Sequence, residues 1–306
     1  MTAPIEVSTP AVPADRAVSA TPPGRRRTGG HLHRSPASSV LLHTTLVLTS
    51  VIALFPVVWI LIASFKPARS IVSSRIRLVD EPTLDNYRRL LGDTDFGLWF
   101  LNSVVVAAFT MLIGVFMAAT AGYALSRFNF PGKRSLMWTF LVTQMFPVAI
   151  LIVPIYAIMS NLGLINTRTS LVIAYCTVAV PFCTWMLRGY FNTIPREIDE
   201  AAAIDGLGPF SIFWRLILPL ARPGLAVTAF YTFLTAWGEV AYASAFIQTG
   251  DRYTLAYGLQ TFVPEFNPQW HLLTPAAILI TIPAAVVFLY AQRHLVSGLA
   301  AGATKG

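Results

Sequence analysis

The stretch Glu200-Ala201-Ala202-Ala203-Ile204-Asp205-Gly206, followed after nine residues by Leu216-Ile217-Leu218-Pro219, is a polar connection between two long apolar segments. Pro195 suits the first turn of a helix, and the acidic residues that follow it favour the positive end of the helix dipole. Gly206 predicts a left-handed turn that ends this helix, and Pro209 fits the first turn of a second one. The stretch therefore predicts a helix, a glycine turn and a second helix.

The side chains of this stretch indicate a contact surface. The three alanines form helix well and have little bulk, so another protein can approach the backbone closely. The second helix, residues 210–216, is too apolar to lie free in water and is expected to pack on the ends of membrane helices. The alternative is an ordinary amphipathic connector at the membrane surface.

The composition is that of a membrane protein. Hydrophobic residues make up 55% of the chain and charged residues 12%, and the mean hydropathy is +0.62. Soluble domains carry about 25% charged residues, so no soluble fold of this size competes. A bilayer core is crossed by about 20 apolar residues. Six stretches reach that length and predict an all-α integral membrane protein with six transmembrane helices: 40–62, 103–125, 136–158, 170–187, 224–247 and 272–292.

The basic residues predict the orientation. With six crossings both termini share one side, and 14 of the 22 basic residues fall on that side. The positive-inside rule places this side, and the stretch at 195–219 with it, in the cytoplasm. The net charge of +8 is then a signal of topology and of anionic lipid rather than of a nucleic-acid partner.

Four regions follow along the chain. Residues 1–38 are rich in proline and arginine and predict a disordered cytoplasmic tail, not a secretory signal. Residues 39–97 hold the first helix and the first external loop, residues 98–292 hold the other five helices, and residues 293–306 form a cytoplasmic C-terminal tail.

The sequence contains no motif for ATP hydrolysis, for other catalysis or for metal binding. It contains no phosphate-binding loop of the G-x-x-x-x-G-K-[ST] type and no H-E-x-x-H pair, and its five histidines and two cysteines do not cluster at zinc spacing. We therefore expect no ATPase site, no other catalytic residues, no metal and no cofactor in this chain.

Two polar residues inside the apolar segments are candidates for a translocation pathway. Glu239 is an acid within the fifth segment, where a carboxylate faces a protein interior or a watery path; the alternative is a hydrogen-bonded packing residue. Gln144, with Pro147 and Pro154, predicts a kinked third helix with polar groups inside. The aromatic loop at 249–271 either docks on a partner outside the membrane or rests in the interfacial aromatic belt.

The polar stretch resembles the EAA loop of permease subunits in binding-protein-dependent ABC importers. From about residue 102 onward, the chain resembles the smaller permease subunit of maltose/maltodextrin-type importers. The matching pieces are Phe130-Pro131-Gly132-Lys133, Gln144-Met145-Phe146-Pro147, the EAA-like loop, Tyr253-Thr254-Leu255-Ala256, Ala291-Gln292-Arg293, Gly298-Leu299, Ala301-Gly302 and Lys305-Gly306.

The resemblance implies a type I ABC importer permease in a bacterial-type cell membrane, with a cytoplasmic coupling loop. The implied partners are a second permease subunit, an ATPase dimer that binds ATP and Mg, and an extracytoplasmic sugar-binding protein. The residues implied to contact the ATPase are Glu200, Ala201, Ala202, Asp205, Gly206, Pro209 and Pro219, together with Gly302, Lys305 and Gly306 near the C-terminus. Those implied to contact the binding protein are Tyr253, Thr254, Leu255 and Gln260.

The cargo that the resemblance implies is maltose, maltodextrin or a related oligosaccharide. The alternatives are a permease for another sugar or for glycerol phosphate and, from a different class, a secondary transporter coupled to protons through Glu239. An inverted repeat or several intramembrane acids would favour the last, and the sequence shows neither.

Overall fold

The computed structural model describes residues 36–71 and 82–303, and every regular element in these ranges is a helix. The elements are α1 (Pro36–Ser64), α2 (Ala68–Ile71), α3 (Asp85–Gly92), α4 (Phe96–Arg127), α5 (Lys133–Thr143), α6 (Val148–Asn161), α7 (Arg168–Phe191), α8 (Glu197–Ile204), α9 (Pro209–Ile212), the π-helix η1 (Phe213–Ile217), α10 (Leu218–Leu220), α11 (Arg222–Trp237), α12 (Ala241–Phe246), the 3₁₀-helix η2 (Gly250–Arg252), α13 (Leu255–Gln260) and α14 (Trp270–Ala303).

The chain divides into two compact units, residues 1–54 and 55–306. In the first unit, the described part of α1 exposes its apolar side chains, as expected of a helix that lipid or another chain surrounds. Residues 1–35 of the predicted tail lie outside the described residues, and residues 36–38 already belong to α1.

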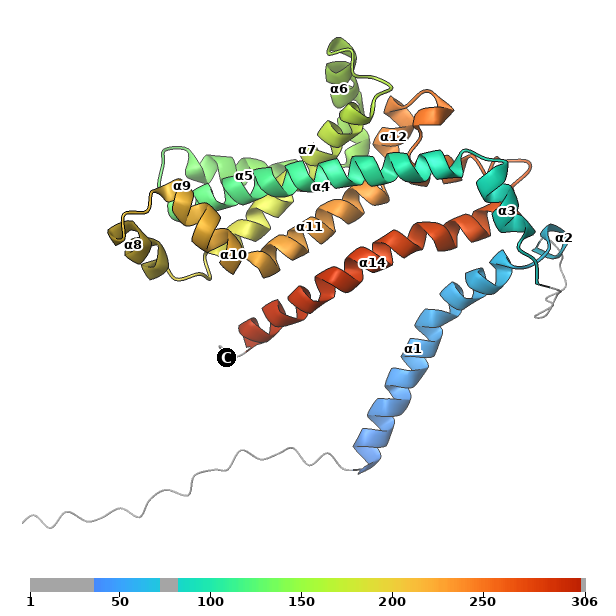
Figure 1. The fold of residues 1–306 in the computed structure, drawn as a ribbon, viewed down its shortest axis with the longest axis horizontal. Helices are drawn as coiled ribbons and strands as arrows, with labels where there is room; N and C mark the ends of the chain where they lie inside the picture. The colour runs from blue at the N-terminus through green and yellow to red at the C-terminus, as the bar shows by residue number, and fades with distance from the viewer. Residues whose placement is uncertain (1–35, 72–81, 304–306) are drawn as a thin grey trace, which may run out of the picture. The chain divides into compact units, whose positions relative to one another are not determined.

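The second unit is built around α4, its longest helix with fully described side chains. This helix packs along α7 and α11, and α11 packs in turn against α14 (Figure 1). Lipid tails are as apolar as leucine, so such helices associate by close packing, and small residues favour it. Gly114, Ala118 and Gly122 are accordingly among the buried residues of α4.

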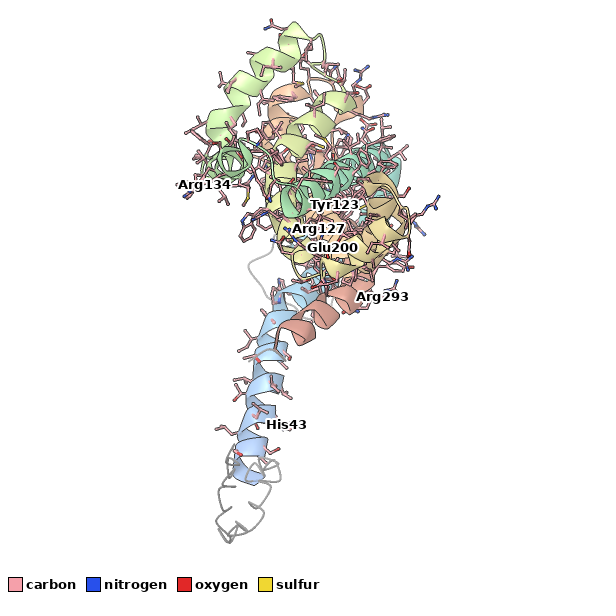
Figure 2. All side chains as sticks on the ribbon, turned by 90° about the vertical axis from the view of Figure 1, so that its left-hand side faces the viewer. His43, Tyr123, Arg127, Arg134, Glu200 and Arg293 are labelled. Carbon is pink, nitrogen blue, oxygen red and sulfur yellow. The ribbon has the colours of Figure 1, made fainter. Side chains whose placement is uncertain are left out.

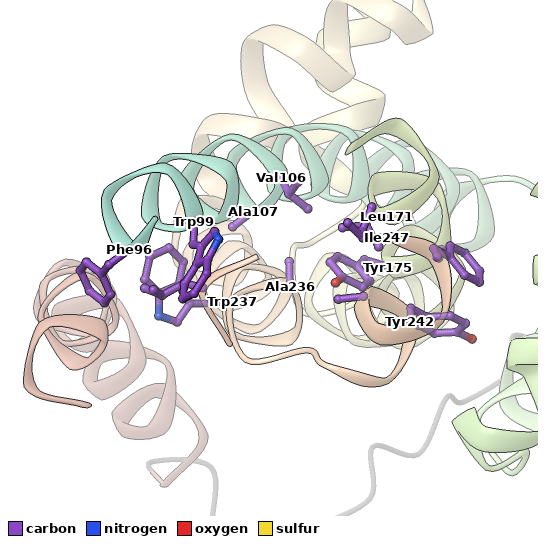
Figure 3. Packing of buried hydrophobic residues seen from close by; sticks show 14 of the residues in the cluster. Phe96, Trp99, Val106, Ala107, Leu171, Tyr175, Ala236, Trp237, Tyr242 and Ile247 are labelled. Carbon is purple, nitrogen blue, oxygen red and sulfur yellow. The ribbon is translucent and has the colours of Figure 1, made fainter. Parts of the chain in front are cut away.

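Two clusters of buried side chains hold this unit together. One joins the first half of α4 to α7, α11, α12, α13 and α14 and contains Trp99, Tyr175 and Trp237 (Figure 3). The other joins the C-terminal half of α4 to α7 and to the connection at 194–221. The second cluster fixes the polar stretch on the membrane helices.

Four predicted spans are confirmed as continuous helices. Within the described ranges, four apolar helices are long enough to cross a membrane, and each contains one predicted stretch: Ser38–Ser64, Phe96–Arg127, Arg168–Phe191 and Trp270–Arg293. Two bent helix pairs raise the number to 6 if each pair is one span.

The third predicted span is broken rather than gently kinked. Helices α5 and α6 meet at an angle of 109°, and residues 144–147 separate them. Pro147 has no N–H for a helical hydrogen bond and directly precedes α6. The prediction of a proline-related distortion was right in its position and too small in its size.

The fifth predicted span, 224–247, is wrong as a single helix. Helix α11 ends at Trp237, and α12 begins only at Ala241. Moreover, α11 is preceded by the segment Pro209–Leu220, to which it is bent by 80°. Apolar composition alone does not reveal these breaks, because all the pieces share it.

The contact between α13 and α4 offers a test of this packing. A Cβ atom added at Gly258 would lie 2.3 Å from Cε3 of Trp99, whereas one added at Gly97, also on α4, would meet nothing within 4 Å. We expect Gly258→Ala to destabilise the protein by roughly 1–3 kcal/mol through overpacking. The matched Gly97→Ala should leave stability unchanged or slightly raised, because alanine favours a helix over glycine.

Thermal unfolding of the two purified variants in detergent measures the difference. Equal melting temperatures for both variants and the parent would contradict the packing of α13 on Trp99.

Candidate functional site

Helix α8 presents one face to the protein and one face outward. Its buried face carries Ala202, which is 5% exposed, and the half-buried Ile198. On the outward face Glu200, Ala201 and Ala203 are exposed, and Ile204 is 87% exposed. Three acids, Glu197, Asp199 and Glu200, occupy the first turn as predicted, where the helix dipole favours negative charge. The outward face is thus a small, shallow and partly apolar surface.

The turn after α8 is confirmed as the predicted glycine turn. Gly206 has a φ of 85°, in the left-handed region that glycine enters without strain. Its N–H donates to the carbonyl of Ala203 at 3.1 Å, and the N–H of Leu207 donates to the carbonyl of Ala202 at 3.0 Å. This pair of bonds is a Schellman motif, which satisfies the last carbonyls of the helix.

The second helix of the connection also begins as predicted. Pro209 is at the first position of α9, and the segment continues through η1 and α10 to Leu220. Pro219 cannot donate a hydrogen bond to the carbonyl four residues earlier, and the π-helical stretch lies just before it. Ile212, Phe213 and Ile217 are buried, so this segment packs on the helix ends.

A largely buried ion pair fastens α8 to the end of α4. Nη2 of Arg127 lies 3.0 Å from Oδ2 of Asp199, and the two side chains are 7% and 18% exposed. The same guanidinium nitrogen donates to the carbonyl of Ile194 at 3.0 Å. The hydroxyl of Tyr123 donates to Oδ1 of Asp199 at 3.3 Å. One carboxylate therefore binds two side chains from successive turns of α4. Figure 2 shows Tyr123 and Arg127 close to Glu200 of the same helix α8.

A second set of hydrogen bonds joins the same elements. Nη2 of Arg196 donates to the carbonyl of Ser126 at 3.1 Å, and the hydroxyl of Ser126 donates to Oδ1 of Asn192 at 2.7 Å. Arg127 and Arg196 place positive charge at the C-terminus of α4, where the helix dipole favours it. The end of α4 is thereby tied both to the segment before α8 and to α8 itself.

Aromatic packing completes the attachment. The ring of Tyr123 lies 4.8 Å from that of Phe213 and 6.0 Å from that of Phe191. A cavity of about 230 Å³ remains beside this cluster, lined in part by Arg196, Glu200 and Pro209. The contacts of Tyr123, Arg127 and Arg196 thus form a base that holds α8, and the cavity beside this base is open at Glu200.

Sequence analysis missed this base. The basic residues of the sequence were used only to predict the topology, with no contact predicted for Arg127 or Arg196, and Tyr123 was not considered. Tyr123 and Arg127 are four residues apart and share one helix face, which is a usable signal. Their partner Asp199 lies 76 residues beyond Tyr123, and no local pattern indicates that contact.

Both pathway candidates lie at breaks in the membrane helices. The carboxylate of Glu239 accepts hydrogen bonds from the N–H groups of Tyr242 at 2.9 Å and Ala243 at 3.3 Å, at the start of α12. Nε2 of Gln144 donates to the carbonyl of Val178 at 3.1 Å, between α5 and α6. Glu239 thus satisfies N–H groups that the first turn of α12 leaves free, as a membrane interior requires, whereas Gln144 binds a carbonyl inside the continuous helix α7.

The loop before α14 is fastened to α4 from the opposite end. Nδ2 of Asn102 donates to the carbonyls of Asp251 and Tyr253, both at 2.9 Å, and the N–H of Leu255 donates to the hydroxyl of Ser103 at 2.7 Å. Of the predicted contact residues, Thr254 and Leu255 are buried and Tyr253 is half-buried.

The accessible part of this loop lies further along the chain. Gln260 is exposed, and so are most of the residues that follow it up to Asn267. Phe266 is 92% exposed, the largest exposure among the described apolar side chains of the loop. The loop therefore exposes the side chain of Phe266, while its residues 251–255 are hydrogen-bonded to α4.

The predicted C-terminal contact is only partly described. Helix α14 continues to Ala303, so the backbone of Gly302 is helical, while Lys305 and Gly306 lie outside the described residues. Within the described ranges, His, Cys, Asp and Glu side chains form no group that could hold a metal ion.

Comparison with known proteins gives one family. Residues 110–300 match the model of the family described as "Binding-protein-dependent transport system inner membrane component". The chain is 33% identical over 278 residues to the diacetylchitobiose uptake system permease protein NgcG of Streptomyces coelicolor, covering 89% of this chain and 92% of that protein. It is 34% identical over 272 residues to the maltodextrin transport system permease protein MdxG of Bacillus subtilis, covering 88% and 97%.

A solved structure shares the fold. A chain of a bacterial ABC transporter involved in the import of the acidic polysaccharide alginate superposes with a TM-score of 0.74 at 21% identity, covering 83% of this chain and 95% of that chain. The predicted type I importer fold is therefore confirmed.

Removing one partner of the ion pair should loosen α8. We expect Arg127→Gln or Asp199→Asn to cost about 3 kcal/mol of local stability, because each leaves a largely buried charge without its partner. Hydrogen exchange of the amides at 197–207 should accelerate, and the double variant should recover part of the loss.

The exposed pair of Arg88 and Asp85, 3.7 Å apart, provides the control. Arg88→Gln should leave exchange unchanged, because exposed ion pairs contribute little. Unchanged exchange at 197–207 in both buried-pair variants would show that α8 is held by other contacts.

Proposed function

The chain belongs to the family of inner-membrane components of binding-protein-dependent transport systems, and from this premise we propose that it moves a sugar into the cytoplasm as one permease subunit of an ABC importer. As a member of this family it is a multi-pass inner-membrane protein and not itself an enzyme. The observation that carries the proposal is the accessible face of α8, held by Arg127 and Asp199 at the end of α4.

The cargo proposed is an oligosaccharide. The relatives named above are permeases for diacetylchitobiose and for maltodextrin, which are both oligosaccharides. Maltose or maltodextrin is the finer proposal that the sequence motifs favour; another sugar and glycerol phosphate are the alternatives.

The proposed coupling surface is the outward face of α8 with the turn that follows it. Glu200, Ala201 and Asp205 are exposed there, and a separate ATPase dimer that binds ATP and Mg would dock on them. Ala202 faces inward, so it would pack α8 on the membrane helices rather than touch the ATPase. When the ATPase dimer closes, α8 would move with it, and the ion pair would pass that motion to α4 and its neighbours as a rigid-body rotation.

Further partners are proposed for the two ends of the membrane helices. An extracytoplasmic sugar-binding protein would contact the loop at 260–267, with Tyr253, Thr254 and Leu255 as its base. A second permease subunit would pair with this one in the bilayer. Both termini would lie in the cytoplasm, where Gly302, Lys305 and Gly306 would reach the ATPase.

A proton-coupled mechanism through Glu239 is less well supported. Its carboxylate accepts hydrogen bonds from the backbone N–H groups of Tyr242 and Ala243 and so caps the start of α12. A structural role accounts for this acid without a proton pathway.

The coupling proposal predicts different effects at two nearby glycines. Gly206→Val forces a β-branched side chain into a left-handed conformation, at a cost of about 1–3 kcal/mol, and should turn the second helix away. Gly208 has a φ of −72° and a ψ of 160°, which valine readily adopts, and a Cβ atom there meets nothing within 4 Å. Gly206→Val should therefore impair ATPase capture and sugar uptake, and Gly208→Val should impair neither.

Co-expression with the partner subunits, followed by co-purification and uptake assays, measures both effects. Parental ATPase capture and uptake in Gly206→Val would contradict the assignment of this turn to coupling.

The proposed binding-protein contact predicts a defect at Phe266. Phe266→Ala should raise the concentration of sugar-loaded binding protein that half-stimulates ATP hydrolysis by about tenfold, because an exposed aromatic residue is a frequent centre of binding energy. The control is Leu91→Ala on α3, since Leu91 is 59% exposed but lies outside the loop. The assay is ATP hydrolysis by the complex in vesicles, and an unchanged response in Phe266→Ala would remove this loop from the contact.

A further inference from the structure

A basic cavity lies next to α5, and it shares no lining residue with the cavity beside α8. Its volume is about 570 Å³, and it is lined by Phe130, Gly132, Lys133, Arg134, Met137, Trp138, Leu141 and Arg188. Three of these side chains are cationic, and no acidic side chain is among them. An uncompensated group of cations is unfavourable unless an anion joins it.

The cations are largely unused by the protein itself. Among the described residues, Arg134 and Arg188 form no ion pair, and Nε of Arg188 is buried without a hydrogen-bond partner. Arg134 is exposed at the edge of the protein (Figure 2). Lys133 is partly engaged, because its Nζ donates to the carbonyl of Phe128 at 2.9 Å. Two guanidinium groups thus remain for a ligand.

The backbone adds to the same electrostatic preference. Helix α5 has 11 residues and begins at Lys133, on the wall of the cavity. Its N-cap is Gly132, which has no side chain to bind the N–H groups of the first turn. The N–H of Lys133 donates to the carbonyl of Phe130 at 3.3 Å, so the backbone contribution is the positive end of the helix dipole, which favours an anion and phosphate in particular.

The remaining wall is apolar. Met137, Trp138 and Leu141 follow the cations by about one and two turns of α5, and Trp138 is 56% exposed. Tryptophan is enriched where a membrane meets water, because its ring is apolar and its N–H is polar. A soluble phosphate would make no apolar contact with this wall, whereas the glycerol and acyl part of a lipid would pack against it.

The cavity also lies at the appropriate depth. Its lining includes Phe130, just after the C-terminal end of α4, and Arg188, near the C-terminal end of α7. Helix α8 is held at the same end of α4. In the proposed orientation these ends meet the cytoplasmic leaflet, which contains anionic lipids.

We propose that this cavity binds the phosphate headgroup of an anionic membrane phospholipid, with Arg134 and Arg188 as the principal ligands and Trp138 beside the lipid backbone. The site is independent of the sugar and of the ATPase contact, and only its assignment to the cytoplasmic leaflet rests on the proposed function. Basic pockets between membrane helices on this side are typical sites for such lipids.

The test is native mass spectrometry of the assembled importer in mild detergent, supplied with equal amounts of phosphatidylglycerol and phosphatidylcholine. The parent should retain an excess of phosphatidylglycerol. Arg134→Gln combined with Arg188→Gln should lower this preference by about tenfold, because each cation near a membrane surface contributes to the attraction. The double Arg→Lys variant should keep most of it.

Two controls separate this site from general attraction and from misfolding. Arg222→Gln removes an exposed cation at the start of α11, outside the cavity, and should leave the preference unchanged. If the double variant fails to assemble, Arg134→Gln alone measures the same effect, because its side chain is exposed.

Several results would overturn the proposal. They are an unchanged lipid preference in the glutamine variants, an equal fall in Arg222→Gln, and displacement of the lipid by inorganic phosphate, which would indicate a soluble anion. Loss of the second permease subunit from Arg134→Gln without any change in lipid preference would instead show that a protein covers this face.

Discussion

The contact between Arg127 and Asp199 is the constraint on which the rest of the site depends. Burying two charges costs more than their attraction returns unless their geometry is good and further hydrogen bonds satisfy them. Here the hydroxyl of Tyr123 and the carbonyl of Ile194 supply two such bonds, while Nε of Arg127 is buried without a hydrogen-bond partner. The ion pair therefore fixes the position of α8 on α4 more than it adds to the stability of the fold. It holds a short helix of 8 residues, which would be marginal alone, against the end of a helix of 32 residues.

The membrane imposes a second constraint, which explains the polar residues inside the apolar segments. A broken helix frees backbone groups that lipid cannot bind, so side chains or neighbouring helices must satisfy them. Glu239 does this at the start of α12, and Gln144 ties the break before α6 to a carbonyl of α7. The helices α6 and α12 that follow these two breaks contact each other. The rings of Tyr156 and Phe246 lie 5.9 Å apart at that contact. The two helix breaks thus place α6 and α12 in contact with each other.

Sequence reasoning succeeded where the physics is local. The left-handed conformation of Gly206, the helix start at Pro209 and four of the apolar spans follow from rules that act within one or two helical turns. It failed where a distant partner decides. Nothing near Asp199 indicates Arg127. The stop at Trp237 has a local signal in Gly238 and Glu239, but the apolar residues on both sides of it obscured the break. Thr254 and Leu255 matched a motif, yet their burial depends on Ser103 and its neighbours in α4.

The central claim is that the outward face of α8 receives a separate ATPase, and site-specific cross-linking tests it most directly. The native Cys176 and Cys183 are 9% and 0% exposed, so a new surface cysteine would be the reactive one. Ile204→Cys, on α8, and Ile150→Cys, on α6 and 62% exposed in the parent, would each be treated with a short bifunctional reagent in membranes that contain the whole complex. The account predicts cross-links from position 204 to an ATPase chain and none from position 150. Cross-links from position 150 alone, or none from position 204 to any ATPase chain, would contradict it.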